Sequence, residues 1–368
     1  MKVLFASGGT GGHILPIVAV KQELEKIGQE RNIPMEFLLV GYVDDTAKSL
    51  LESYNIPYKS VYAGKIRRYF SFDNFLDVFK AIGGLIAAQW YIWKFMPDIT
   101  FGKGGYASVP GVLISWLYQI PTLIHESDSV PGLANKFLSR FASVVAVGFP
   151  KVAAVFGEKK TSIVGNMTHP DIMNGSREDA KALFELTMEK PILLIVGGSQ
   201  GAHIINQVIW SILPRLTDIV EIIHIVGKND TLEASKVKKS LTGSEERLYH
   251  YVGFLNDEMK HAYAAADLVI SRAGASSIAD ICLTRKPSIL VPITVDAGQQ
   301  RSNAYEMAKI GASLVLEEPN FTPHIVIDKI EELLRQPNIM QSMSEKTIQF
   351  ASPDAAARIA EQLVVLAK

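Results

Sequence analysis

Residues 7–16, SGGTGGHILP, combine four glycines with one histidine directly after the apolar run VLFA. A loop between a buried strand and a helix can present bare amides and the positive end of the helix dipole to an anion. His13 stands where a helical pattern begins, and the dipole there disfavours the imidazolium, so we expect a neutral ring. A neutral imidazole is a competent general base, whereas a capping or cleft-lining histidine is the alternative interpretation.

This glycine-rich loop matches neither of the two common nucleotide-binding patterns. The third glycine position of the dinucleotide pattern is occupied by Ile14. The loop is also not followed by the Gly-Lys-Ser/Thr of a P-loop, in either half of the chain. The glycines could therefore serve only a tight turn. A second loop of the same kind, GGSQGAHI at 197–204, favours a function, because ligands collect at the carboxyl ends of parallel strands.

The second half of the chain adds two loops of small and amide-bearing residues. SRAGASSIAD, at 271–280, opens a helix with hydroxyl groups suited to a diphosphate, and Asp280 could bind ribose hydroxyls. ITVDAGQQRSNA, at 293–304, has amide donors and acceptors that can read sugar hydroxyls. Helix capping is the alternative for Ser276 and Asn303. The candidate residues of these two loops are Ala275, Ser276, Ser277, Asp280, Gln299, Gln300 and Asn303.

The composition excludes several classes of protein. The 368 residues are 48% apolar and 20% charged with a net charge of −1, so neither global disorder nor general attraction to nucleic acid is expected. The single cysteine, Cys282, excludes an internal disulfide and fits a reducing cytoplasm. The apolar run 81–93 is shorter than the ~20 residues that span a bilayer, and the first apolar run is too short for a signal peptide.

Short β-rich runs alternate with helical patterns along most of the chain, which predicts α/β domains with doubly wound parallel sheets. The halves also repeat each other, since VLFASGGTGGHI and LLIVGGSQGAHI share a strand, a glycine turn, a histidine and a helix. We therefore expect two Rossmann-like domains facing a cleft, at 1–163 and 164–345, with a plausible hinge at 164–176. Residues 346–368 are expected to form a helix that packs back on the first domain.

Seven motifs, in order from residue 7 to about 304, resemble those of the MurG family of bacterial peptidoglycan transferases, within glycosyltransferase family 28. They are GGTGGHILP, GKIRRYF, GKGGYASVP, HESDSVPGLANK, GGSQGA, SRAGASSIAD and QQRSNA. The resemblance implies the GT-B fold, with the acceptor bound by the first half and UDP-N-acetylglucosamine (UDP-GlcNAc) by the second. It implies inverting transfer of GlcNAc to the muramoyl 4-hydroxyl of lipid I, an undecaprenyl-diphospho-muramoyl peptide, giving lipid II without a metal ion or cofactor.

The resemblance also assigns roles to individual residues. His13 matches the usual candidate for the general base, with Glu126 and Asp128 as rivals, while His125 is interpreted as bracing its loop. The further donor contacts that it implies are Thr10, Gly11, Gly12, Asn166, His169, Ser199 and Leu255. The residues expected on the acceptor and membrane side are Lys65, Arg67, Arg68, Tyr106, His125 and Lys136.

Three positions depart from the family pattern. HESD replaces the commoner HEQN, so Asp128 stands where an amide is usual. GNMTH replaces GNPVR, which puts His169 where an arginine often contacts the donor. Asp280 replaces a glutamate that is one methylene longer.

Residues 59–103 carry seven Lys or Arg against three Asp, interleaved with aromatic residues. This pattern suits a surface that lies on anionic headgroups, and inward-packed aromatics with solvated cations are the alternative. Together with this pattern, the resemblance implies a peripheral protein on the cytoplasmic face of the cell membrane, active in cell-wall synthesis, cell shape and division. The rival functions are another UDP-sugar transferase with a lipid acceptor and a UDP-GlcNAc epimerase-like protein.

Overall fold

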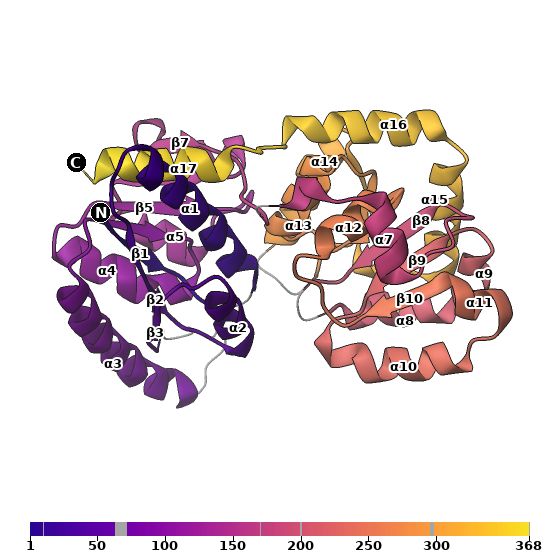
Figure 1. Cartoon of the computed structure of the whole chain (residues 1–368), viewed down its shortest axis with the longest axis horizontal. Coiled ribbons are helices and arrows are strands. Elements are labelled where there is room, and N and C mark those ends of the chain that lie inside the picture. Colours follow the sequence, from indigo (N-terminus) through magenta and orange to yellow (C-terminus); the bar gives the residue numbers. More distant parts are fainter. Residues whose placement is uncertain (10, 63–71, 170, 199–200, 295–297, 368) are drawn as a thin grey trace. The chain divides into compact units, whose positions relative to one another are not determined.

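The computed structural model describes residues 1–9, 11–62, 72–169, 171–198, 201–294 and 298–367. The chain divides into two compact units (Figure 1). Unit 1 comprises Met1–His169 together with Ser352–Lys368, and unit 2 comprises Pro170–Ala351.

The division lies a few residues beyond the boundaries at 163/164 and 345/346 that the sequence suggested. Val164 is buried in the apolar core of unit 1, so the segment after residue 163 stays with that unit. The short 3-10 helix η7 (Thr347–Gln349) packs against α13 (Ala275–Leu283) of unit 2. Core contacts therefore decide where each unit ends.

Unit 1 is built on a parallel sheet whose described strands have the order β3-β2-β1-β4-β5-β6-β7. The strands are β1 (Lys2–Ala6), β2 (Glu36–Gly41), β3 (Tyr58–Ser60), β4 (Ile99–Gly102), β5 (Thr122–Glu126), β6 (Val144–Val147) and β7 (Thr161–Ile163). The chain moves outward from β1 to β3 and then returns to β4 on the other side of β1. Ligands of such sheets bind at the carboxyl ends of the strands where the order reverses, here after Ala6 and Gly102.

Helices cover both faces of this sheet, as a buried parallel sheet requires. They are α1 (Gly11–Glu30), α2 (Asp45–Ser53), α3 (Phe72–Phe95), α4 (Val109–Leu117), α5 (Leu133–Leu138), α6 (Ala153–Phe156) and α17 (Ala355–Leu366). Along β1, Val3 and Phe5 lie in a core shared with α1 and α17, whereas Leu4 lies in a core shared with α3 and α4. Helix α17 lies along α1 (Figure 1), where Arg31 Nη2 is 2.5 Å from Glu361 Oε1.

Unit 2 repeats this plan with a parallel sheet of order β10-β9-β8-β11-β12-β13 in its described part. The strands are β8 (Ile192–Val196), β9 (Glu221–Ile225), β10 (Tyr249–Val252), β11 (Leu268–Ser271), β12 (Ser288–Leu290) and β13 (Ser313–Val315). The order reverses between β8 and β11, so the second expected ligand edge follows Val196 and Ser271. These two doubly wound sheets confirm the fold class that the sequence predicted.

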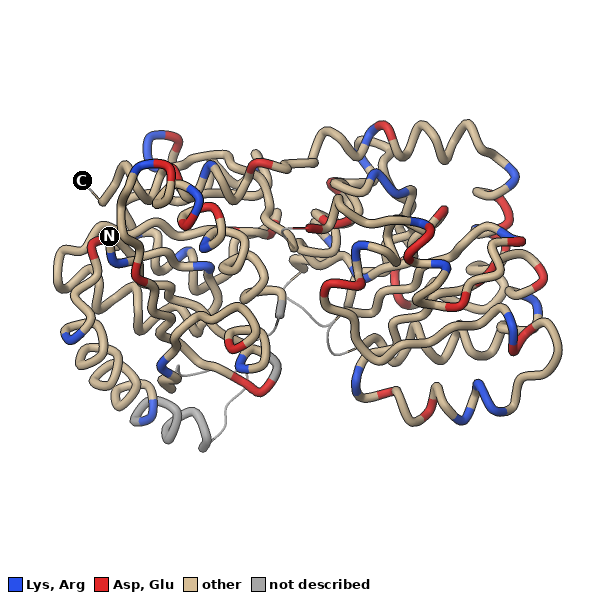
Figure 2. Tube along the Cα trace, viewed as in Figure 1, with Lys and Arg blue, Asp and Glu red and all other residues tan. Residues whose placement is uncertain are grey.

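The helices of unit 2 again flank the sheet, with charged residues of both signs along their solvent faces (Figure 2). Besides α13 they are α7 (Arg177–Phe184), α8 (His203–Ser211), α9 (Leu213–Thr217), α10 (Thr231–Ser240), α11 (Gly243–Leu248), α12 (Met259–Ala265), α14 (Gln299–Lys309), α15 (Pro323–Leu334) and α16 (Pro337–Lys346). Within the described ranges of both units, no helix is long and apolar enough to span a bilayer.

Candidate active site

The loop after β1 carries His13 to the carboxyl edge of the first sheet. Gly8 packs so closely on the segment after β2 that a Cβ would lie 1.9 Å from the Tyr42 carbonyl oxygen. Gly9 has a φ of +90° and donates its N–H to the same oxygen at 2.8 Å. Both positions thus require glycine, and the docked loop starts α1 at the point where the strand order reverses.

The environment of His13 keeps its ring neutral. Burial, with the positive charge of Lys103 as a second cause, lowers the pKa of His13 from 6.5 to about 4. Its Nδ1 is enclosed and has no hydrogen-bond partner among the described residues. The ring lies against the loop after β4, where a Cβ on Gly105 would be 3.4 Å from His13 Cε1. A neutral imidazole can accept a proton from a substrate hydroxyl at a ring nitrogen that the substrate reaches.

Lys103, the residue after β4, is the buried cation beside this histidine, with an exposed fraction of 4%. Burial lowers the pKa of Lys103 to about 8, against the opposing charges of Glu126 and Asp128. Its Nζ donates to Ser127 Oγ. Burial, with the charge of Lys103 as a second cause, lowers the pKa of His125 well below 6.5, so its ring is neutral. Its Nε2 donates to the Gly165 carbonyl at 2.9 Å, and Nδ1, which then carries no proton, faces Ser127 Oγ at 3.5 Å. This geometry braces His125 against the loop after β7.

The carboxylate of Glu126 is occupied by its own loop. It accepts hydrogen bonds at 2.9 Å from three donors, the backbone N–H groups of Asp128 and Gly132 and the side-chain amide of Asn135. These bonds tie the end of β5 to the start of α5. Of the two carboxylate rivals to His13, Glu126 therefore serves as a brace in this geometry, while Asp128 lies within electrostatic range of Lys103.

The other predicted residues of unit 1 are spread around this cluster. Asn166 joins it, because its Nδ2 donates to the Ser127 carbonyl at 2.9 Å. His169 is buried and lies 3.1 Å from the Tyr54 hydroxyl, next to α2. The ring of Tyr106 lies 6.4 Å from that of Tyr42. Gly11 and Gly12 are the first residues of α1, Lys136 is exposed on α5, and Thr10, Lys65, Arg67 and Arg68 lie outside the described residues.

Unit 2 brings together the loops that the sequence selected for a nucleotide sugar. Ala275, Ser276 and Ser277 form the first turn of α13, with Asp280 in the same helix. Asn303 Nδ2 donates to the carbonyl of Ala273 at 3.2 Å, which ties α14 to the residues just before α13.

Gln299 and Gln300 begin α14 and thus lie near the same strand ends, and Ile293 N donates to Gln300 Oε1 at 3.2 Å. Leu255 follows β10 and is 8% exposed. Ser199 lies outside the described residues.

Two features of the site were not selected from the sequence. The sequence placed Lys103 among the basic residues of a membrane-facing surface. The structure buries it beside His13, so that part of the interpretation is wrong. The sequence did contain a signal for its position in the site, because Lys103 directly follows the apolar strand ITFG and so stands at the carboxyl end of that strand. The second missed feature is a buried ion pair in unit 2, between Arg272 and Glu318, at 2.6 Å.

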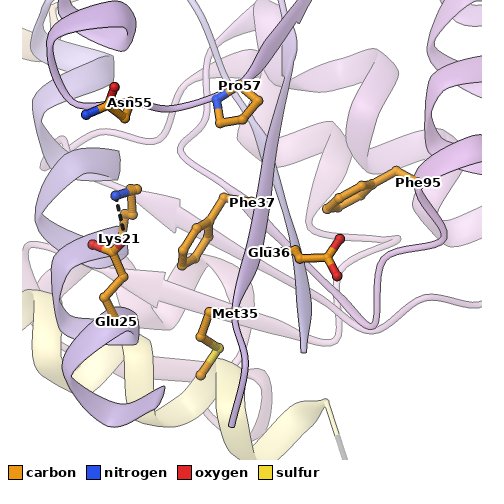
Figure 3. Close-up of a pocket in the computed structure, with 8 residues that line it drawn as sticks. All are labelled: Lys21, Glu25, Met35, Glu36, Phe37, Asn55, Pro57 and Phe95. Atoms are coloured by element: carbon orange, nitrogen blue, oxygen red, sulfur yellow. Dashed lines mark hydrogen bonds and ion pairs between the residues drawn. The ribbon is translucent and has the colours of Figure 1, made fainter. Parts of the chain in front are cut away.

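A metal site and a second pocket are the other kinds of site to consider in the described residues. No group of three or more His, Cys, Asp and Glu side chains in the described ranges could hold a metal ion. Unit 1 has a hollow of about 500 Å³. Figure 3 shows the side chains that line it, among them Glu36 and Phe37 of β2. These residues begin β2, so the hollow lies at the opposite sheet edge from His13, and its Lys21 is paired with Glu25 at 2.7 Å.

Two doubly wound units, one with a neutral histidine and one with loops of small and amide-bearing residues, are the arrangement expected of a GT-B glycosyltransferase. Residues 3–147 match the glycosyltransferase family 28 N-terminal domain, and residues 192–359 match its C-terminal domain. The chain belongs to glycosyltransferase family 28, as the motifs predicted.

Relatives cover nearly the whole chain. A transferase of Clostridium kluyveri is 33% identical over 354 residues, 95% of this chain and 96% of its own length. One of Legionella pneumophila is 34% identical over 98% of this chain and 96% of its own. Both are named UDP-N-acetylglucosamine–N-acetylmuramyl-(pentapeptide) pyrophosphoryl-undecaprenol N-acetylglucosamine transferase.

Solved structures agree with this assignment. MurG of Acinetobacter baumannii has a TM-score of 0.72 at 26% identity, with 99% of each chain covered. A UDP-GlcNAc 2-epimerase of Neisseria meningitidis, with a TM-score of 0.68 at 13% identity over 99% of this chain and all of its own, shares the fold alone.

Proposed function

We propose that the chain transfers GlcNAc from UDP-GlcNAc to the muramoyl 4-hydroxyl of lipid I, with inversion, and so makes lipid II for peptidoglycan. The names of its relatives in family 28 describe this donor sugar and this lipid-linked acceptor. The observation that carries the proposal is the neutral His13, whose enclosed nitrogen is uncommitted at the ligand edge of unit 1.

Unit 2 is the proposed donor site. The first turn of α13 offers backbone N–H groups and hydroxyls to the diphosphate, which stabilises the charge that develops on the departing UDP. Asp280 would bind the ribose, and Gln300 on α14 the transferred sugar. Leu255 would contact the uracil through its backbone. Asn303 supports this arrangement because its bond to Ala273 keeps α13 and α14 together.

Unit 1 is the proposed acceptor site, with His13 as the general base. The acceptor hydroxyl attacks the anomeric carbon in one displacement, and its proton passes to the histidine ring. A base with a pKa near 4 is weak at neutral pH, so proton transfer needs a nearby negative charge to stabilise the imidazolium. An acceptor diphosphate near Lys103 would supply that charge.

The pH dependence of the reaction tests this environment. The acid limb of kcat/KM reports the base of the free enzyme, and we expect it near pH 4 rather than 6.5. Lys103→Met removes a charge that helps to lower the pKa of His13, so the limb should move to higher pH. Rates measured across the acid range, with exposed Lys26→Met as the control, check this. If the acid limb of kcat/KM stayed at the wild-type pH in Lys103→Met, the role of Lys103 in lowering the pKa of His13 would be contradicted.

The acceptor is lipid-linked, and unit 1 has a face that suits a membrane surface. Helix α3 exposes one apolar stripe at helical spacing, and its Ile86, Trp90 and Trp93 are more than half exposed. Helix α4 packs beside α3 and α5 beside α4. Lys80 and Lys94 lie in the described part of α3 (Figure 2), while Asp73 and Asp77 stand near the start of the helix. This aromatic face is made by Ile82, Ile86, Trp90, Trp93, Trp116, Leu117, Tyr118, Leu133 and Phe137.

An exposed apolar face bordered by cations is typical of proteins that lie on anionic lipid. We therefore propose that the aromatic face rests on the cytoplasmic leaflet. That position would bring the enzyme to the headgroup of its acceptor.

The experiment that tests the proposed function measures UDP release from UDP-GlcNAc with and without a soluble lipid I analogue. We expect release only with the acceptor, in a one-to-one ratio with a disaccharide product. Acceptor-independent turnover with formation of the 2-epimer would replace the proposal by the epimerase alternative. Activity only with a different lipid acceptor would replace it by the other transferase.

A further inference from the structure

Two adjacent glutamates, Glu317 and Glu318, follow β13, and the scheme above gives them no role. The side chain of Glu318 is 8% exposed, and its Oε1 lies 2.6 Å from Nη2 of Arg272, the residue after β11. Burying an ion pair costs desolvation free energy, so the pair by itself is weak evidence of stabilisation. Its role must therefore be sought in the atoms that it contacts.

The pair holds the segment that follows β12. Arg272 Nη1 donates to the Val291 carbonyl at 3.1 Å. Glu318 Oε2 accepts from Thr294 twice, from its backbone N at 3.1 Å and its Oγ1 at 2.5 Å. Burial raises the pKa of Glu318, but the hydrogen bonds from Thr294 and Arg272 and the charge of Arg272 outweigh it, so the net shift is downward. The carboxylate thus stays ionised and holds the backbone N–H and the hydroxyl of Thr294, the residue after Ile293.

The neighbouring residue, Ile293, in turn sets the orientation of the Gln300 side-chain amide through its own backbone N–H. Ile293 N is 3.2 Å from Gln300 Oε1. A backbone N–H can only donate, so the amide oxygen of Gln300 faces Ile293 and its NH2 group faces the other way.

Glu317 holds the helix that carries Gln300. Its Oε1 accepts from the Tyr305 hydroxyl at 2.7 Å and lies 2.8 Å from Arg301 Nε, both on α14. The two glutamates therefore fix both partners of the bond between Ile293 and Gln300.

We propose that Glu318 is a positioning residue which, through Thr294 and Ile293, orients Gln300 so that its N–H groups donate to the sugar of the UDP-sugar donor. The inference rests on the proposed function and deepens it, because it states what Gln300 recognises. The recognised group is an acceptor oxygen, on a sugar hydroxyl or the acetamido carbonyl. The uracil and diphosphate contacts proposed above do not depend on this amide.

The test compares the binding of UDP-GlcNAc and of UDP, by titration calorimetry on the full chain. In Glu318→Gln an NH2 group must face either Arg272 or Thr294, so the hold on the segment is lost. Thr294→Val removes only one hydrogen bond to the carboxylate, and Thr294→Ser keeps it as the matched control. Loss of a hydrogen bond to a charged group is expected to raise the Kd for UDP-GlcNAc about 10-fold in the first two variants. The Kd for UDP should stay unchanged in all three.

Three results would overturn the inference. They are an unchanged Kd for UDP-GlcNAc in both Glu318→Gln and Thr294→Val, an equal weakening of UDP in both variants, or a Thr294→Ser variant as weak as Thr294→Val. If thermal unfolding shows that Glu318→Gln does not fold, the comparison of Thr294→Val with Thr294→Ser decides alone. Failure of the proposed function is separate, because it would be seen in the wild-type chain as absent transfer to the lipid acceptor.

Discussion

His13→Gln is expected to lower kcat by about 10²- to 10⁴-fold, the range that a general base contributes, with an unchanged Kd for UDP-GlcNAc. The ring is neutral, and its Nδ1 has no partner among the described residues, so its removal breaks no hydrogen bond of that atom. The donor site is assigned to the other unit, so binding of the donor should persist. Steady-state kinetics with the lipid acceptor and calorimetry with UDP-GlcNAc measure the two quantities.

The control for this variant is His324→Gln, at an exposed position of α15. It should have wild-type kinetics. If His13→Gln kept its kcat, the base would have to be sought at the rival carboxylate of Asp128. A parallel loss of donor binding would instead mean that His13 shapes the donor site.

Replacing both Trp90 and Trp93 by alanine is expected to detach the protein from membranes. The two ring centroids lie 5.4 Å apart on the exposed side of α3, with the ring planes tilted by 33°. At ~25 cal/mol per Å², each indole would contribute about 1–2 kcal/mol on insertion. The two indoles together correspond to about 2–4 kcal/mol, so the double variant should bind anionic vesicles about 30- to 700-fold more weakly. Its kcat/KM should fall for lipid I in vesicles and stay unchanged for a soluble acceptor analogue.

Vesicle sedimentation and parallel assays with the two acceptors separate these effects. Leu232→Ala, at an exposed apolar residue of unit 2, is the matched control and should change neither. Equal binding of the double variant and the wild type to vesicles would show that the aromatic face serves another purpose. A similar loss on both acceptors would point to a damaged acceptor site.

Local sequence patterns carried the prediction of the fold. The core strands are short β-rich runs, and several of them are followed by a glycine turn, so the sequence predicted the alternation of strands and helices. It also predicted the repeat between the two halves. The exact unit boundaries were not readable, because they depend on which core buries residues such as Val164. No local pattern contains that information.

The sequence predicted candidate site residues only where a residue's role follows from its place at the end of a strand. His13, Ser276 and Gln300 were selected in this way, and the structure puts them at ligand edges of the two sheets. Lys103 was misread because its burial depends on strands and loops far away in the sequence. Glu318 was missed because its partner Arg272 is remote in the chain and because an acidic residue after a strand is commonly solvated.

The anomeric configuration of the product tests the central claim most directly, that one displacement with His13 as base joins the sugar to a lipid-linked muramoyl 4-hydroxyl. The measurement is the NMR coupling between H1 and H2 of the transferred GlcNAc, in product made from UDP-GlcNAc and a lipid I analogue. We predict the large coupling of a β-linkage at the 4-position. An α-linkage, or GlcNAc on another hydroxyl, would contradict the account.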